Sequence, residues 1–412
     1  MPFDRIEDVL AAEISELEQK GTAKGAETVI TEVVPAGSGR GPRYRLEGQG
    51  DRPFLKMNSN NYLGMSLTPE VIEAEEATSR RFGAGPGAVR FISGTYRQHV
   101  ELEARLAAFH GRAAAMIFSS AYATSLGVLV PLASPETVLI SDELNHNCII
   151  NAVRLARPKA KAVYKHNDMG DLEAKLSEAA GAARRAIVVT DGIFSMRGDH
   201  APLSRMVELA RRFDGEFPEN VVVVVDDSHG VGAFGETGRG TEEATGVPGG
   251  ADLLIATLGK ALGVNGGYVV GSETAIRYLR ETAPTYIYSN PITPAEAAAA
   301  RAALEILDSG RGRELLSHLR TMTRRFEKGL TDLGYETIPG EHPVTPLMVR
   351  DTAKARALVK HLFERGILVT GLTYPVGPRG DESLRFQLSA EHTEADVDEV
   401  LAALASFPGR RS

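Results

Sequence analysis

The sequence has little cysteine, no long hydrophobic run and no excess of basic residues. Cys148 is the one cysteine in 412 residues, which excludes an intrachain disulfide and any zinc or iron–sulfur site built from several cysteines. The 46 basic and 54 acidic residues give a net charge of -8, and this balance argues against a nucleic-acid partner. The longest apolar string, valines 221–225, is too short to cross a bilayer as a helix. We therefore expect a cytoplasmic protein with no membrane partner.

The length and the 43% hydrophobic content predict one large and one smaller domain. Acidic residues are scattered through the N-terminus, so we expect a helix there rather than a secretory signal. Residues 37–50 are dense in glycine, arginine and proline, which predicts a flexible connection or a loose hairpin with solvated arginines. The predicted division is an N-terminal segment 1–57, a large domain 58–292 and a small domain 293–412. The apolar residues at helical spacing near the N-terminus are Ile6, Val9, Leu10, Ile14 and Leu17.

From residue 114 onward, short apolar runs alternate with helix-forming sequence. The runs are AAMIF (114–118), TVLI (137–140), AIVV (186–189), VVVVV (221–225) and LLIA (253–256). This alternation predicts an α/β fold with parallel strands. Each run ends in a polar cluster, and open parallel sheets bind ligands beyond the carboxyl ends of their strands. The five clusters are therefore expected to line one crevice.

The alternation of apolar runs and helix-forming sequence ends near residue 293. Thr293 and Pro294 form a good N-cap and first position for a helix, which we expect Gly310 to close. The remaining sequence alternates helices and short strands. It predicts a small α+β domain at the C-terminus.

Asp226, His229 and Lys260 follow two of these predicted strands. A carboxylate at the end of a buried strand needs a partner, which would be either a cation such as a protonated pyridine nitrogen or the amides of a helix that Asp226 caps. His229 would reach a neighbouring substituent of the same ring. Lys260 lies in TLGKALG, whose glycines let the backbone approach a ligand closely. The alternative for Lys260 is a solvated surface lysine.

Three further positions have two interpretations each. Ser119 and Ser120 precede a predicted helix, whose free N–H groups suit a phosphate, although an ordinary helix cap uses the same residues. The His146 ring would stack on a flat ligand or serve as a hydrogen-bonded structural group. Arg385 alternates with apolar neighbours in a strand-like stretch, so it needs an anion. That anion is either a substrate carboxylate or a salt-bridge partner.

A series of motifs appears in order along the chain, from about Asn58 to His392. Together they resemble the α-oxoamine synthases, pyridoxal-phosphate enzymes of fold type I. Within that family the motif sequences are most similar to those of the glycine C-acetyltransferase (2-amino-3-ketobutyrate CoA ligase) branch. The motifs are NNYLG (60–64), VRFISGT (89–95) with His99, SDELNH (141–146), TDGIFSM (190–196), VDDSHGVGAFGETGRG (225–240), TLGKALG (257–263), YSN (288–290) and RFQLSAEHT (385–393).

The resemblance implies an α/β fold of type I, in which helices flank a mostly parallel central sheet and a smaller α+β domain follows. It also implies an acyltransferase that joins a small amino acid to an acyl-CoA thioester with pyridoxal 5'-phosphate (PLP) as cofactor. Lys260 would hold the cofactor as a Schiff base and move the α-proton, and Asp226 would pair with the pyridinium nitrogen. His229 and Ser195 would contact the phenolic oxygen, while His146 would stack over the ring.

The same resemblance implies sites for the cofactor phosphate and for the substrate. The phosphate would lie on the start of a helix and on the Thr257 hydroxyl, with Ser289 arriving from a second subunit, which implies a homodimer. Asn60 and Arg385 would hold the substrate carboxylate. The residues at the start of the helix are Ser120, Ala121 and Tyr122.

Some positions depart from the family pattern and leave the acyl donor open. Gly377 replaces a bulkier apolar residue, Asn265 interrupts a glycine run, and residues 37–50 look like an insertion. One alternative is a decarboxylating relative similar to 5-aminolevulinate or 8-amino-7-oxononanoate synthase, because FSSAY (118–122) and KHND (165–168) also occur in aminolevulinate-type sequences. Others are a fold type I aminotransferase or aldolase, and a non-enzymatic carrier, against which the polar clusters argue.

Overall fold

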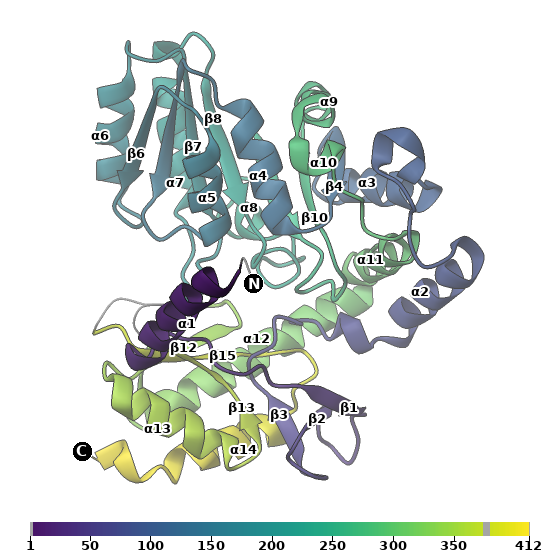
Figure 1. Ribbon diagram of the computed structural model, residues 1–412, viewed down its shortest axis with the longest axis vertical. Coiled ribbons are helices and arrows are strands. Elements are labelled where there is room, and N and C mark those ends of the chain that lie inside the picture. The colour runs from purple at the N-terminus through teal and green to yellow at the C-terminus, as the bar shows by residue number, and fades with distance from the viewer. Residues whose placement is uncertain (1–2, 374–379, 412) are drawn as a thin grey trace.

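The computed structural model describes residues 3–373 and 380–411. Its largest element is a seven-stranded sheet in the order β4-β10-β9-β8-β7-β5-β6 (Figure 1). The five predicted strands are confirmed as β4, β5, β7, β8 and β9, which all run in one direction. The bounds are β4 Ala114–Phe118, β5 Thr137–Asp142, β6 Ala160–Tyr164, β7 Arg185–Asp191, β8 Val221–Asp226, β9 Leu253–Thr257 and β10 Gly267–Gly271.

Two strands of this sheet were not predicted. β6 lies at the edge of the sheet and is mostly exposed, so its sequence AKAVY lacks the continuous apolar run of a central strand. β10 is antiparallel to both β4 and β9, and glycines at its ends make its sequence resemble a loop. The sheet is therefore mixed but mostly parallel.

Helices cover both faces of the sheet, which explains why its central strands are apolar on both sides. Successive side chains of a strand, such as Val188 and Val189 of β7, belong to separate hydrophobic clusters, because they point to opposite faces of the sheet. One cluster contains residues of α4, α5 and α9, the other residues of α6 and α7. The bounds are α4 Ala121–Leu132, α5 Asn147–Leu155, α6 Met169–Ala179, α7 Leu203–Phe213 and α9 Glu273–Thr282.

The predicted helix start at Thr293 is confirmed. The Thr293 hydroxyl accepts the Glu296 amide (3.0 Å) and the Glu296 carboxylate accepts the Thr293 amide (2.7 Å), which satisfies two amides at the start of α11 (Pro294–Leu307). The predicted end at Gly310 is wrong. The helix ends at Leu307, and Gly310 is the first residue of α12 (Gly310–Asp332), because Ser309 caps a new helix there.

The C-terminal part contains a small antiparallel sheet in the order β11-β12-β15-β14. It lies below the large sheet in Figure 1, with α12, α13 and α14 beside it. The limits 57/58 and 292/293 stay predictions. The bounds are α2 Pro69–Phe82, α3 Arg97–Phe109, α8 Thr241–Ala244, α10 Pro284–Ile287, β11 Glu336–Thr337, β12 Val344–Met348, α13 Thr352–Phe363, β14 Thr370–Leu372, β15 Ser383–Gln387 and α14 Glu394–Ala405.

The N-terminal segment forms a third sheet with the C-terminal part. β1 (Ile30–Val34), β2 (Arg43–Leu46) and β3 (Pro53–Lys56) are antiparallel neighbours, and β3 pairs in parallel with β13 (Ile367–Leu368). The hairpin predicted for residues 37–50 is therefore confirmed, since β2 pairs with β1 and β3, but the prediction that its arginines are solvated is wrong for Arg43. Arg43 bonds to the buried Asp396 carboxylate of α14 at 2.6 Å, since an acid at the start of that helix provides a ready partner.

The predicted N-terminal helix is confirmed as α1 (Asp4–Gln19). Its apolar residues lie at the predicted spacing, but none of its side chains is buried. Within residues 3–373 and 380–411, every helix is either too short or too polar to cross a bilayer.

Candidate active site

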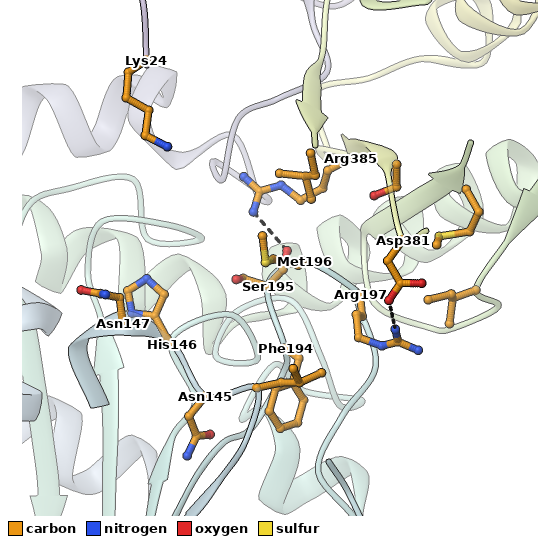
Figure 2. A pocket seen from close by; sticks show the side chains of 15 residues that line it. Lys24, Asn145, His146, Asn147, Phe194, Ser195, Met196, Arg197, Asp381 and Arg385 are labelled. Carbon is orange, nitrogen blue, oxygen red and sulfur yellow. Dashed lines mark hydrogen bonds and ion pairs between the residues drawn. The ribbon is translucent and has the colours of Figure 1, made fainter. Parts of the chain in front are cut away.

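The polar clusters that follow the five predicted strands meet in one pocket, as predicted. Its innermost part is a cavity of about 50 Å³, and a larger pocket of about 670 Å³ adjoins it through the shared residues His146 and Ser195 (Figure 2). The inner pocket therefore combines residues from five separate strand ends. It is lined by Ala121, Tyr122, His146, Cys148, Asp191, Ile193, Ser195, Asp226, Ser228, His229 and Lys260.

Asp226 and Lys260 line this inner pocket together. The Asp226 carboxylate is buried and accepts the Ser228 amide (3.1 Å) and the Ser125 hydroxyl (3.2 Å). Burial lowers the pKa of Lys260, although the charges of Asp226 and Asp191 act in the opposite direction. A lysine with a lowered pKa keeps more of its amine neutral, which favours attack on a carbonyl.

Asp191 is a second buried carboxylate that the sequence analysis did not single out. It lies beside Asp226 because the two residues are register partners on the parallel strands β7 and β8. Its Oδ2 accepts the His146 amide at 2.6 Å, and burial and the Asp226 charge raise its pKa well above the ordinary value. Two neighbouring carboxylates favour a bound cation. The TDGIFSM motif contained the signal for this residue.

His229 is buried and bonds through Nδ1 to the Tyr62 hydroxyl at 2.7 Å. Burial, followed by the Lys260 charge, lowers the pKa of His229 well below its ordinary value, so the ring is neutral. Burial also raises the pKa of Tyr62, so the phenol keeps its proton and donates it to Nδ1. The His229 hydrogen then lies on Nε2. Tyr62 was missed as a functional residue, although it lies in the NNYLG motif.

The helix α4 begins at the edge of the inner pocket. Ser120 caps it by accepting the Ala123 amide at 3.0 Å, which confirms the capping interpretation for its side chain. Ala121 and Tyr122, the first two helical residues, line the pocket, and the amides of a first helical turn have no carbonyl partner within the helix. A side chain at Gly267 would come within 2.3 Å of the Ala121 nitrogen. This helix start suits a phosphate.

Besides Ser120, two predicted phosphate ligands do not line the inner pocket. Thr257 lies at the end of β9, where its hydroxyl donates to the Gly266 carbonyl (3.1 Å), and it pairs in register with Gly267. Ser289 lies beyond α10 and donates to the Asn290 carbonyl at 3.4 Å. The roles of Thr257 and Ser289 remain predictions, and the role of Ser289 needs a second subunit.

Arg385 reaches the pocket from β15 of the small sheet. Its Nη1 donates to the Ser195 carbonyl at 3.0 Å (Figure 2), while its buried Nε has no acceptor among the described residues. An unpaired guanidinium N–H favours a bound anion. Asn60 Oδ1 accepts a hydrogen bond from Gln387 and lies 3.3 Å from the Tyr62 hydroxyl, and Gln387 lies on the same face of β15 as Arg385.

His146 lies at the mouth of the inner pocket. Its Nδ1 contacts the Cys148 thiol at 3.0 Å, and its side chain is exposed. An exposed ring beside Lys260 and Asp226 offers a flat surface for another ring. The pocket therefore combines a lysine, a buried acid, a helix start suited to a phosphate and a flat ring, which are the parts that PLP requires.

The fold and this pocket define a pyridoxal-phosphate enzyme of fold type I. Residues 52–404 match the family model described as Aminotransferase class I and II. The chain is 38% identical to an 8-amino-7-oxononanoate synthase of Thermosipho melanesiensis over 95% of each chain. It is 39% identical to a human mitochondrial 2-amino-3-ketobutyrate coenzyme A ligase over 97% of this chain and 91% of the relative. The chain belongs to the α-oxoamine synthases, PLP-dependent acyltransferases that condense an amino acid with an acyl-CoA.

Solved structures agree with this family. A serine palmitoyltransferase of Sphingomonas wittichii has a TM-score of 0.87 and 30% identity, with 97% of this chain and 96% of that chain covered. A serine palmitoyltransferase variant from S. paucimobilis contains a PLP–myriocin adduct and has a TM-score of 0.87 and 27% identity, with 98% of both chains covered. PLP is the cofactor of this chain.

Proposed function

We propose that this chain joins glycine, or another small amino acid, to a short acyl-CoA in the manner of a glycine C-acetyltransferase. The observation that carries the proposal is Arg385, whose unpaired Nε lies on the wall of a pocket that also contains His146 and Ser195. A guanidinium in this position fits the carboxylate of an amino acid bound over Lys260. The similarity to human 2-amino-3-ketobutyrate coenzyme A ligase supports this substrate class.

The residues of the inner pocket divide the chemistry among them. When bound, PLP supplies an electron sink for the charge left at the substrate α-carbon. Lys260 takes the α-proton, a role for which its lowered pKa suits it. Asp226 places a negative charge against the ring nitrogen and keeps it protonated. His229 Nε2 and the Ser195 hydroxyl donate to the phenolic oxygen, and His146 covers the ring.

The phosphate and carboxylate ends of the bound groups are held by different parts of the chain. The amides of Ala121 and Tyr122 at the start of α4, with the Thr257 hydroxyl, hold the phosphate. Arg385 and Asn60 would hold the substrate carboxylate and so orient the α-carbon toward Lys260. This orientation is how the energy of binding the carboxylate would raise the rate of proton removal.

The larger pocket is the proposed site of the acyl thioester. It has a volume of about 670 Å³ and is lined partly by the apolar side chains of Ile338, Met348 and Leu372. Lys24 and Arg197 lie at the same pocket (Figure 2). Lys24 would attract the negative charges of a CoA, whereas Arg197 already pairs with Asp199 and Asp381. Gly377, where the sequence departs from the family pattern, lies outside the described residues.

A second candidate is an 8-amino-7-oxononanoate synthase-like reaction with loss of the carboxylate. The apolar lining of the larger pocket favours it, because this lining would also accept a longer acyl chain. The Thermosipho relative at 38% identity supports the same candidate. A fold type I aminotransferase or aldolase would act on an amino acid without any thioester.

We also propose a homodimer in which Ser289 reaches the phosphate site of the second subunit. The neighbouring Tyr288 is 79% exposed, and Phe91 and Ile92 are 67% and 69% exposed. Large apolar side chains that are this exposed favour burial against a partner. A strictly monomeric active enzyme would contradict this proposal.

A matrix of amino acids and acyl-CoA donors tests the proposed function. Each pair is assayed for thiol release, and each product is weighed by mass spectrometry. We expect the highest kcat/KM with glycine and acetyl-CoA. A product that has lost carbon dioxide would favour the second candidate, and turnover of an amino acid without thiol release would overturn both.

A further inference from the structure

One motif of the sequence has no role in the proposed chemistry. This motif is KHND (165–168), directly after β6, and its histidine lies between two carboxylates. His166 Nδ1 is 3.1 Å from Asp142 Oδ1, and His166 Nε2 is 3.1 Å from Asp199 Oδ2. The side chain of His166 is 15% exposed and that of Asp142 is fully buried. Water therefore screens these contacts only weakly.

Both ring nitrogens of His166 must donate a hydrogen. A neutral imidazole has one N–H and one lone pair, and a lone pair facing a carboxylate would be repelled. Burial lowers the pKa of His166, but hydrogen bonds and charges from Asp142 and Asp199 outweigh it and raise the pKa to about 9. The other nearby charges are Glu143, which accepts the His166 amide, and Arg197, which bonds to Asp199. His166 is therefore a cation at neutral pH.

The Asn167 side-chain amide makes a longer contact of 3.3 Å with His166 Nε2. The same amide group donates to the His200 carbonyl at 3.2 Å. The shorter contact of Nε2 is the one with Asp199, so the carboxylate is its main partner.

The two carboxylates belong to different loops of the site. Asp142 ends β5, accepts the Leu144 amide (2.8 Å) and begins the segment that leads to His146. Asp199 closes the loop 194–199, since its carbonyl accepts the Phe194 amide at 2.9 Å. The Phe194 ring lies edge-on against the His166 ring, with centroids 4.3 Å apart. His166 thus joins two loops that line the larger pocket.

The loop 194–199 also supports the predicted carboxylate site. Ser195 lies in this loop, and its carbonyl accepts Arg385 Nη1 at 3.0 Å. Phe194 lines the larger pocket and separates it from His166. His166 therefore acts on the site through this loop and not by touching a substrate.

We propose that His166 is a positioning residue whose cation holds the loop 194–199 against the end of β5. In this way it keeps Ser195, and through the Ser195 carbonyl the Arg385 guanidinium, in place for the substrate carboxylate. The proposal rests on the proposed function, since the role of Arg385 as a carboxylate ligand is part of that function.

Two substitutions of His166 separate its charge from its size. His166→Gln removes the cation and is expected to raise the KM for the amino acid about tenfold, the effect of about one lost charge-assisted hydrogen bond. The imine absorbance and the KM for the acyl-CoA should change less than about twofold. His166→Arg keeps a cation with several N–H donors and should restore most of the affinity. Equal losses in both variants, or a loss of cofactor binding, would overturn the proposal.

The pH profile gives a second readout. The His166 pKa is raised from its ordinary 6.5 to about 9, so the stabilisation is complete below 6.5 and is lost as the pH rises through about 9. The KM for the amino acid should therefore rise near pH 9. Asp199→Asn removes one carboxylate and should move this rise to lower pH, while His166→Arg should remove it. If the rise came instead from ionisation of the amino acid or of Lys260, KM would depend on pH in the same way in the unsubstituted enzyme, Asp199→Asn and His166→Arg. That result would overturn the proposal.

We call the contacts of His166 with Asp142 and Asp199 the His166 clamp. The clamp can also be tested without substrate, so a negative result for the clamp is distinguishable from a negative result for the proposed function. Absence of imine absorbance and thiol release in the unsubstituted enzyme would contradict the function alone. An NMR titration of His166, assigned by its loss in His166→Gln, should give a pKa near 9. Amide exchange in residues 194–199 should be faster in His166→Gln than in His318→Gln, a control whose histidine bonds the His392 carbonyl. A His166 pKa near 6.5, or equal exchange, would overturn the clamp.

Discussion

The two walls of the site differ in how completely their polar groups are paired. On the wall formed by the large sheet, Asp226 accepts two hydrogen bonds below 3.3 Å and His229 is bonded to Tyr62. On the wall formed by β15, Arg385 Nε and Gln387 Oε1 are buried without a partner among the described residues. Ser228 Oγ is an exception on the first wall. Buried polar groups are normally paired, so we expect a ligand to complete the second wall.

This difference separates the expected effects of substitutions. The large-sheet wall is organised by contacts within the protein, so changes there should alter the cofactor and the rate. We propose that the β15 wall binds the substrate anion, so changes there should alter substrate affinity. Each prediction below tests this division.

The largest effect is expected from Lys260→Ala. Loss of the amine removes both the covalent attachment of PLP and the base, so the imine absorbance should disappear and thiol release should fall about 10⁴-fold. Lys328→Ala, a change to an exposed lysine that pairs with Asp332, should leave both unchanged. Persistence of thiol release would show that another residue is the base.

Asp226→Asn should have the next largest effect. Without a carboxylate opposite the ring nitrogen, the electron sink is weakened, and kcat should fall about 10²- to 10³-fold while imine absorbance remains. Asp252→Asn is a matched control, because the Asp252 carboxylate accepts the Val223 amide near the start of β8, away from the strand ends at the site. An unchanged kcat in Asp226→Asn would show that this acid does not act on the cofactor.

Arg385→Gln tests the other wall. Removing a guanidinium that binds a carboxylate costs about 2–3 kcal/mol, so the KM for the amino acid should rise about 30- to 150-fold. The imine absorbance should be kept, and Arg385→Lys should lie between the two proteins because it retains only the charge. Loss of the cofactor from Arg385→Gln with unchanged affinity for the amino acid would contradict this division between the two walls.

Tyr62→Phe should have the smallest effect. It removes the donor that holds the His229 hydrogen on Nε2, at a cost of about 1 kcal/mol, so kcat should fall about fivefold and the imine spectrum should shift. The amino acid KM should change less than in Arg385→Gln. Tyr278→Phe removes an exposed hydroxyl that bonds the Pro131 carbonyl and should change neither. A rise in the amino acid KM larger than the fall in kcat would place Tyr62 on the substrate side.

Much of the site could be predicted from the sequence because it lies at the ends of apolar strands. Lys260 and Asp226 each follow such a strand, and the parallel topology brings both into one pocket. Asp191 and Tyr62 could not be assigned in this way. Asp191 is next to Asp226 only through the register of β7 and β8, and Tyr62 meets His229 across 167 residues of sequence.

The fold shows the same limit at its irregular positions. The start of α11 was predictable because its cap is formed by residues three apart. The end at Gly310 was not, because the glycine begins a second helix capped by Ser309. Residues 37–50 resemble a loop in composition, but Arg40 and Arg43 bond to carboxylates on α14 more than 350 positions away.

The sequence by itself determined the α/β alternation, the family motifs and most residues that line the inner pocket, because these depend on local periodicity and on residue types at strand ends. Only the tertiary structure decided which groups are paired and which are left open. The free Arg385 Nε, the Tyr62–His229 bond and the His166 clamp each depend on contacts between distant segments. Hydrogen bonding and desolvation depend on distance in space, and spacing along the chain does not fix that distance.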